Sequence, residues 1–228
     1  MNKCVDMIEK LLNDATLYID LIKTAMHETR VAIELVDSRE TATLVLDDKL
    51  EVLEGSVKPD FKISMTKQVL KDILEGRADA FALAARGRAD EKRPIEFEVY
   101  KKEREKELWE TIKILLTYFF VAGKVKIRHL TPGRAGYAHG AHPIPLVYWN
   151  GIRYSWLLVR RGEVLNKDKE KDPYPQTFMI LKGKGKAIIG EEEFDIKTNT
   201  AIYIPKNVVH QIVAKDDVEL LWLAWQAW

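Results

Sequence analysis

The sequence predicts two folded regions of different class, an α+β domain followed by a small all-β barrel. In residues 1–122, stretches with apolar residues at helical spacing alternate with stretches in which every second residue is apolar. In residues 150–228 nearly every stretch has a period of two and ends at Gly, Asn, Asp or Lys. Many short strands at even spacing are typical of a small barrel or jelly roll. Residues 123–149, rich in Gly and Pro, are expected to form an ordered connector that can donate a strand to the barrel.

The composition fits a globular chain without a strong charge bias. Hydrophobic residues make up 46% of the 228 residues, which is enough to bury a core. Lys and Arg total 36 and Asp and Glu total 35, which gives a net charge of +1. Because no global basic field results, nucleic acids and anionic membranes are not expected as partners.

Cysteine content and hydropathy predict a cytoplasmic protein. Cys4 is the single cysteine and cannot form an internal disulfide, and no positively flanked apolar segment opens the chain as a secretion signal would. The longest apolar run, around residues 114–122, is interrupted by Thr117 and Tyr118. A membrane span needs roughly 20 apolar residues, so none is predicted.

The first domain is expected to begin with a long amphipathic helix from Val5 to Met26. Strands are predicted at 31–36, 41–46 and 50–55, the first two joined by a polar turn. The remaining elements are a strand at 60–65, a helix capped by Thr66 and ended by Gly76, a helix at 78–85, a strand after Pro94 and a long helix at 101–121. This order predicts a sheet with helices packed on it.

The first 120 residues or so have an order of elements in which strands are followed by the segment TKQVLKDILEGRADAFALAARG. This order resembles that of the sterol carrier protein family. The residues that carry the resemblance are the extended segment 59–65, the helix end 74–76, and the helix of small and aromatic residues at 78–85, followed by Gly87. After Gly87 the family pattern is lost, because residues 88–94 stand in place of a second glycine-containing strand and turn. The resemblance implies a twisted sheet covered by helices around an apolar, lipid-binding tunnel.

Leu70 and Phe81 are the candidate contacts for an apolar ligand in this domain. Together with Ile73, Leu74 and Leu83 they have the spacing of residues that line a tunnel. The same spacing is required of the packed core between a sheet and its helices, so both interpretations stay open.

The connector contains two histidines, His139 and His142, that are three positions apart. Two imidazoles at this spacing can bind one metal ion, and a third ligand would be needed from elsewhere in the chain. The alternative is that both are solvent or interface histidines.

In the second domain Gly162, Asp168, Glu170, Gln176 and Gly183 have a spacing that resembles the first motif of the cupin family. That motif has a glycine, five residues, a His-x-His pair, a short gap, a glutamate, six residues and a glycine. Here Gly162 is followed by Asp168 and Glu170 at the pair, by Gln176 at the glutamate, and by Gly183. The gap before Gln176 is longer than usual and contains two prolines.

The second cupin motif is also recognisable. It has a glycine, five residues, Pro-x-Gly, two residues and a histidine, and these places are filled by Asn199, Pro205, Asn207 and His210. Asn replaces both glycines, and Asn is the next most tolerant residue for left-handed backbone. The resemblance covers about residues 150–228.

The resemblance implies a metal site that has lost most of its usual ligands, since only His210 remains. With Asp168, Glu170 and Gln176 beside it, a harder divalent ion such as manganese or magnesium would be favoured. The alternative is that both carboxylates belong to a solvated loop while Gln176 and His210 face a metal-free pocket. No cofactor is firmly implied, and one divalent ion is the alternative.

Catalysis is not specified by these residues. His210 can act as an acid or base beside Tyr174 or Tyr203, but no nucleophile with a paired base is visible and no glycine-rich phosphate loop precedes a helix. The sequence therefore predicts binding of a small or apolar ligand by a non-catalytic carrier or sensor.

Two alternatives of function stay open. One is a metal-dependent cupin enzyme that acts on a small metabolite. The other is an oligomerisation module, since cupin barrels resemble a family that commonly dimerises through sheet faces. Trp222, Trp225 and Trp228 in the last strand would serve a homodimer.

Overall fold

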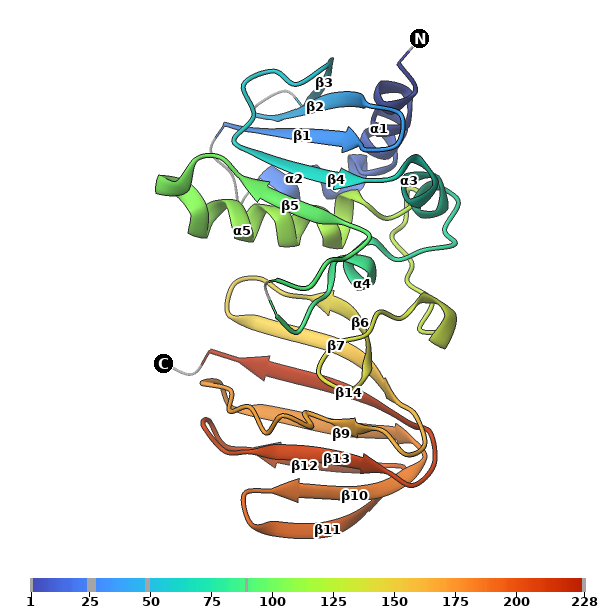
Figure 1. Cartoon of the computed structure of the whole chain (residues 1–228), viewed down its shortest axis with the longest axis vertical. Coiled ribbons are helices and arrows are strands. Elements are labelled where there is room, and N and C mark those ends of the chain that lie inside the picture. The colour runs from blue at the N-terminus through green and yellow to red at the C-terminus, as the bar shows by residue number, and fades with distance from the viewer. Residues whose placement is uncertain (1, 24–27, 48–49, 89, 227–228) are drawn as a thin grey trace. The chain divides into compact units, whose positions relative to one another are not determined.

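The protein divides into two compact units in a computed structural model that describes residues 2–23, 28–47, 50–88 and 90–226 (Figure 1). Unit 1 comprises Met1–Ala84 and Lys92–His129, and unit 2 comprises Ala85–Glu91 and Leu130–Trp228. The end of the helix predicted to reach Met26, and the predicted interface residue Trp228, lie outside the described residues.

Unit 1 contains a five-stranded sheet with the strand order β3-β2-β1-β4-β5. The strands are β1 (Thr29–Leu35), β2 (Glu40–Leu46), β3 (Glu51–Glu54), β4 (Phe61–Met65) and β5 (Glu96–Val99). β1 and β4 are parallel, and the other neighbours are antiparallel. The strands predicted at 31–36, 41–46, 50–55 and 60–65 are thereby confirmed.

The helices of unit 1 are α1 (Lys3–Asp14), α2 (Ile19–Lys23), α3 (Lys67–Leu74), α4 (Ala80–Ala84) and α5 (Glu105–Ile114). A π-helical turn at Leu115–Phe119 continues α5. Thr66 caps α3 as predicted, because its side-chain oxygen accepts a hydrogen bond from Val69 N at 3.3 Å. The prediction of one continuous first helix is wrong: α1 ends at Asp14, and a 3-10 turn at Thr16–Tyr18 separates it from α2. The break lies among Asn, Asp and Thr, all of which are weak helix formers.

The sheet of unit 1 has one apolar and one polar face. Val31, Ile33 and Phe61 are fully buried, and cross-strand register places them on one side. On the other side Lys62 lies 3.1 Å from both Glu34 and Glu98. These two partners raise the pKa of Lys62 above its usual range. Hydrophobic burial therefore fixes one face, while ion pairs cover the other.

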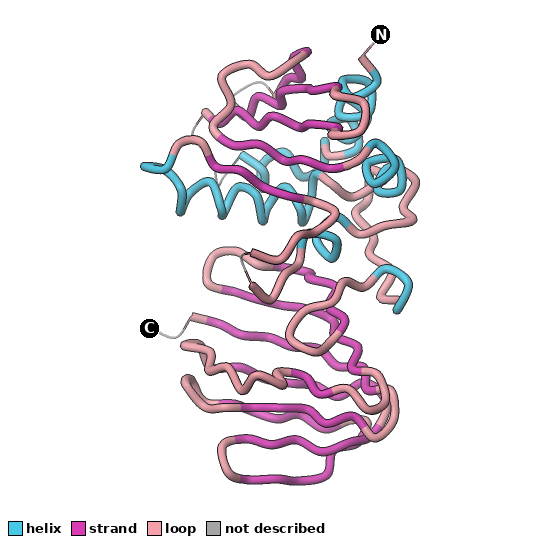
Figure 2. The backbone as a smooth tube through the Cα atoms, in the orientation of Figure 1, coloured by secondary structure: helices cyan, strands magenta, loops and turns pink. Residues whose placement is uncertain are grey.

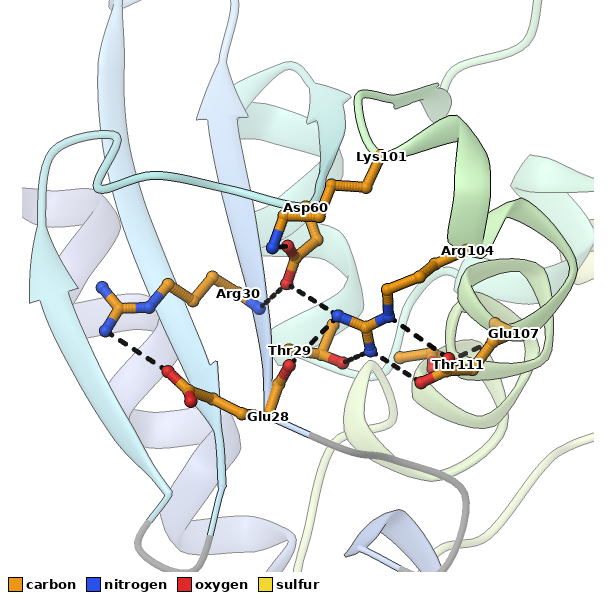
Figure 3. A network of polar contacts seen from close by, with 8 residues as sticks. All are labelled: Glu28, Thr29, Arg30, Asp60, Lys101, Arg104, Glu107 and Thr111. Carbon is orange, nitrogen blue, oxygen red and sulfur yellow. Dashed lines mark hydrogen bonds and ion pairs between the residues drawn. The ribbon is translucent and has the colours of Figure 1, made fainter.

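A charged network joins the starts of β1 and β4 to the start of α5 (Figure 3). Asp60 is 2% exposed, accepts a 2.7 Å hydrogen bond from Arg30 N, and pairs with Lys101. Arg104 lies 3.7 Å from Asp60 and holds Glu107 through two guanidinium nitrogens. Each buried charge of the network thus has an opposite charge beside it.

Unit 2 consists of two antiparallel sheets that enclose a common core (Figure 2). The first sheet has the order β12-β9-β14-β7-β6 and the second has the order β11-β10-β13-β8. The strands are β6 (His142–Val147), β7 (Ile152–Val159), β8 (Val164–Leu165), β9 (Gln176–Lys182), β10 (Lys184–Ile189), β11 (Glu192–Lys197), β12 (Thr200–Ile204), β13 (His210–Ala214) and β14 (Val218–Trp225). The predicted small barrel of short strands is confirmed.

Left-handed residues occur at the two motif positions where Asn replaces glycine. Asn199 has a φ of 64° and Asn207 a φ of 62°. Gly183 has a φ of 87°, which favours glycine. A Cβ there would also lie 2.1 Å from Asp217 O. The frame of both motifs is therefore carried by backbone that ordinary side chains disfavour.

Within the described ranges, no helix has the length and apolar character needed to cross a membrane.

Candidate functional site

The candidate site lies on the inner face of the first sheet of unit 2, where β9 begins and β14 ends. Phe178 and Leu220 belong to the buried core, so the alternation of side chains places Gln176, Trp222 and Ala224 on the same inner face. Ala224 pairs with Gln176 on β9 and with Arg153 on β7. Arg153, Ala224 and Gln176 therefore form one row across β7, β14 and β9.

Gln176 is a buried amide with one of its two polar atoms engaged. Its side chain is nearly enclosed, since the residue is 2% exposed, and its Oε1 accepts a 2.7 Å hydrogen bond from Trp222 Nε1. No hydrogen-bond partner for Gln176 Nε2 lies among the residues that the structure describes. The amide donor is therefore open within the described part of the chain.

His210 faces the same interior from the opposite sheet. It opens β13, pairs with Ile189 on β10, and is 8% exposed. Its Nδ1 lies 3.0 Å from Val208 O, and its ring packs edge-on against Phe178 with centroids 5.7 Å apart. A carbonyl oxygen only accepts, so Nδ1 must carry a proton, and the tautomer with its single proton there has a lone pair on Nε2.

Tyr148 and Ser155 extend the site along β7. The Ser155 hydroxyl donates to the Tyr148 hydroxyl at 3.1 Å, and the Tyr148 ring meets Trp222 edge-on at 5.9 Å. Burial raises the pKa of Tyr148 to about 12, against a smaller opposing effect of the Ser155 hydrogen bond. Tyr148 is therefore a neutral phenol at ordinary pH.

Arg153 brings a positive charge to the end of the row. Its Nη1 lies 3.0 Å from Asp172 Oδ2, and its guanidinium carbon lies 4.6 Å from the centre of the Tyr174 ring. Asp172 Oδ1 accepts from Tyr174 N at 2.9 Å, and the Asp172 carbonyl accepts from Asn207 N at 2.7 Å. The loop before β9 is thus tied to the second motif and holds Arg153 in one orientation.

The structure separates most of the residues predicted as metal ligands. The Asp168 side chain is 71% exposed and lies 4.0 Å from Arg88. Glu170 is 52% exposed and lies 3.2 Å from His139 Nδ1, whereas His142 Nε2 lies 3.0 Å from Glu163. The two connector histidines therefore have different carboxylate partners.

A closed metal site does not fit this arrangement. The described part of the chain contains no group of three or more His, Cys, Asp or Glu side chains placed to hold a metal ion. Gln176 Oε1, which would be a metal-binding oxygen, accepts the Trp222 N–H instead. A site built on His210 would have fewer than the usual three protein ligands.

The other predicted ligand contacts lie in different surroundings. Tyr174 stacks on Arg153 at the site, while Tyr203 is 77% exposed and pairs with Thr177 on the outward-facing alternation. Leu70 and Phe81 are 0% and 6% exposed within unit 1. Of the two tyrosines predicted beside His210, Tyr174 is therefore the one that lies on the loop at the site.

Sequence reasoning missed Arg153, Ser155 and Asp172. The predicted strand at the start of the second domain contained a usable signal, because alternation from Leu157 places Ser155 and Arg153 inward. Asp172 lies in a charged run where composition alone does not distinguish one carboxylate from another.

Two antiparallel sheets with polar residues at one end of their shared interior define a barrel with an inward-facing site. Residues 159–225 match the family model "Cupin domain", and the C-terminal part of the chain is a cupin domain. No curated protein sequence is similar enough to this chain to count as a match.

Several solved structures are similar to the chain at low identity. A cupin 2 conserved barrel domain protein from Salinispora arenicola is 16% identical, with 45% of this chain and 90% of that chain covered and a TM-score of 0.41. The plu4264 protein from Photorhabdus luminescens is 17% identical, with 44% and 87% covered and a TM-score of 0.39. A predicted oxalate decarboxylase from Thermotoga maritima is 16% identical, with 38% and 81% covered and a TM-score of 0.36. Similarity at this level says nothing about the ligand or activity of this chain.

Proposed function

We propose that the cupin domain binds a small ligand beside Gln176, His210 and Trp222, as a non-catalytic carrier or sensor. The observation that carries the proposal is the pair of unengaged nitrogens, Gln176 Nε2 and His210 Nε2, on an otherwise apolar interior. The described residues supply a partner to neither nitrogen, so a ligand that reaches the site can bind both.

The surroundings favour a ligand that is small and partly apolar. The rings of Phe178, Trp222 and Tyr148 border the two polar groups, and aromatic walls with few polar atoms are typical of small-molecule sites. His210 Nδ1 is bonded to a backbone carbonyl and not to a carboxylate that would stabilise its protonated form. This contact supports a binding role over acid-base catalysis.

The proposal is tested by following the indole N–H resonance of Trp222 in the full chain while benzamide is added. Benzamide is planar, apolar on its faces, and has both a donor and an acceptor. We expect its addition to shift the Trp222 signal, because Trp222 donates to the amide that would bind the probe. The Trp109 signal, from a residue on α5 that is 39% exposed, serves as the internal control and should not move.

Substitution identifies the site. In His210→Ala the Trp222 shift should be lost or need far more benzamide, while the rest of the spectrum stays that of a folded chain. If neither benzamide nor benzoate shifts the Trp222 signal of the unsubstituted protein, the proposed binding role is wrong.

A metal-dependent enzyme is the second candidate, and one contact favours it. The bond from Nδ1 to Val208 O leaves His210 Nε2 as the coordinating nitrogen, which is how metal-binding histidines are commonly oriented. Metal analysis after purification without added ions tests this candidate. A stoichiometric ion that is absent from His210→Ala would support it and replace the metal-free proposal.

An apolar ligand in unit 1 and a homodimer are further proposals that rest on the family resemblances. Displacement of a fluorescent fatty acid tests the first, with Leu70 and Phe81 as the residues to enlarge or reduce. Light scattering tests the second, and a strict monomer would contradict it. A cytoplasmic location is proposed from the single cysteine, which fits a reducing compartment.

A further inference from the structure

Arg153 adds a guanidinium to the same row of side chains that holds Gln176. The two residues are separated by Ala224, which is fully buried and has the smallest side chain of the row. Neighbouring strands lie about 4.8 Å apart, so the backbones of Arg153 and Gln176 are about 10 Å apart across β14. Side chains of their length can therefore reach one small molecule between them.

The guanidinium of Arg153 is only partly engaged. Nη1 binds Asp172 and the plane stacks on Tyr174, whereas Nε and Nη2 have no partner among the described residues. The side chain is 38% exposed, so a ligand can reach it from solvent. A guanidinium whose plane is fixed by stacking and whose second edge is open is suited to bind a carboxylate through two parallel hydrogen bonds.

Two largely enclosed arginines of unit 1 do not offer such an edge. Arg104 uses Nε and Nη2 on Glu107 and Nη1 on the Glu28 carbonyl. Arg128 uses Nη1 on Asp79 and Nη2 on the carbonyls of Leu116 and Thr117. Arg153 differs from both because only its Nη1 has a partner among the described residues.

Among the open nitrogens at this end of the barrel, hydrogen-bond donors outnumber acceptors. Gln176 Nε2 and two Arg153 nitrogens are donors, while His210 Nε2 is an acceptor in the tautomer with its single proton on Nδ1. The charge of Asp172 is already shared by Arg153 and by Tyr174 N. A ligand that satisfies the surplus donors must present acceptor oxygens.

We propose that this site binds a small monocarboxylate with a compact apolar group. Its carboxylate binds the open edge of Arg153 and the Gln176 amide, and its apolar group packs on Phe178 and Trp222. This inference rests on the proposed binding function and adds to it the class of ligand.

The test compares benzoate, benzamide and inorganic phosphate in the same titration of the Trp222 indole signal at neutral pH. Benzoate and benzamide have nearly the same shape and differ in charge, and phosphate is an anion without an apolar part. We expect benzoate to bind at least about tenfold more tightly than benzamide, since hydrogen bonds to charged groups are among the stronger ones. Phosphate should bind more weakly than benzoate.

Two arginine variants locate the charge. Arg153→Gln should weaken benzoate binding roughly 10- to 100-fold and leave benzamide unchanged. Arg160→Gln removes the same charge from an exposed position of unit 2 and should leave both unchanged. If Arg153→Gln disturbs folding, Arg153→Lys keeps the charge without the planar fork and should still weaken benzoate selectively.

The outcomes separate this inference from the proposed function. Equal binding of benzoate and benzamide, with no effect of Arg153→Gln, overturns the carboxylate inference and leaves a binding site at Gln176 and His210. Phosphate binding as tight as benzoate overturns the requirement for an apolar group. Failure of all three probes to shift Trp222 removes both the inference and the proposed function.

Discussion

Asp60 of unit 1 and Gln176 of unit 2 are equally buried, each at 2% exposure, but they differ in the partners that surround their polar atoms. Asp60 has Arg30 N, Lys101 and Arg104 around its carboxylate (Figure 3). Gln176 has Trp222 on its oxygen and no described partner on its nitrogen. Asp60 is thus neutralised by charges of the chain itself, whereas the Gln176 nitrogen stays open within the described structure.

The same contrast holds for the positive charges of the two units. Arg128 in unit 1 is enclosed, and burial lowers its pKa while nearby Asp79 opposes this. Its guanidinium binds one carboxylate and two carbonyls, so it ties the segment after α5 to the π-helical turn. Arg153 in unit 2 binds one carboxylate through one nitrogen. Arg128 is thus paired within unit 1, whereas Arg153 keeps two nitrogens without a described partner.

The largest expected effect comes from removing a buried, charge-paired group. Asp60→Ala should lower the free energy of unfolding by roughly 3 kcal/mol, because Lys101 loses its counter-charge, Arg104 loses one of its two carboxylate partners, and Arg30 N loses its acceptor. Urea unfolding of the full chain measures the change. Glu51→Gln, at an exposed position of β3, is the control and should change stability by less than about 0.5 kcal/mol. An equally small change in Asp60→Ala would contradict the structural role of the network.

A smaller effect is expected from Tyr148, which is partly buried in the barrel. Its pKa is raised from 10.0 to about 12, mainly by burial, so between these values the folded state binds more protons than the unfolded state. Stability should therefore fall as pH rises through this window, by roughly 1–2 kcal/mol because the residue is only partly buried. The loss is measured as the difference in unfolding free energy between the unsubstituted protein and Tyr148→Phe.

Tyr203→Phe provides the matched control for that measurement. Tyr203 is 77% exposed, so its removal should leave the pH dependence of stability unchanged. If Tyr148→Phe behaves in the same way as Tyr203→Phe, the Tyr148 hydroxyl ionises freely and is not enclosed with Ser155.

The smallest effect on stability is expected at His210. His210→Leu loses one hydrogen bond to Val208 O and places an aliphatic side chain beside Phe178, so the free energy of unfolding should change by less than about 1 kcal/mol. Binding of benzamide should nevertheless be lost. A loss of more than about 2 kcal/mol would show that His210 serves the fold and would weaken the comparison between the two units.

Local signals in the sequence predicted elements well. Thr66 caps α3, the alternating runs became the strands of both units, and Asn199 and Asn207 have the left-handed backbone of the glycines they replace. The predicted long first helix failed at Ala15, where neighbouring Asn, Asp and Thr favour turns. Such local preferences act within a few residues and so can be predicted from adjacent residues.

The candidate site was predictable only in part. Gln176 and His210 follow from the motif spacing, and the structure places both on the inner face of the barrel. Arg153 and Asp172 were not predicted, because their pairing joins β7 to a loop that is distant in sequence from it. Glu170 was predicted at the site and lies beside His139 instead.

The sequence by itself determined the two classes of fold, the strand positions of the cupin domain, and the two motif residues that face its interior. The tertiary structure decided which polar atoms are paired and which stay open. Pairing depends on strand register and on the path of loops, as at the row of Arg153, Ala224 and Gln176. Side chains that are far apart along the chain meet only when the sheets close, and so the character of the site is decided at that level.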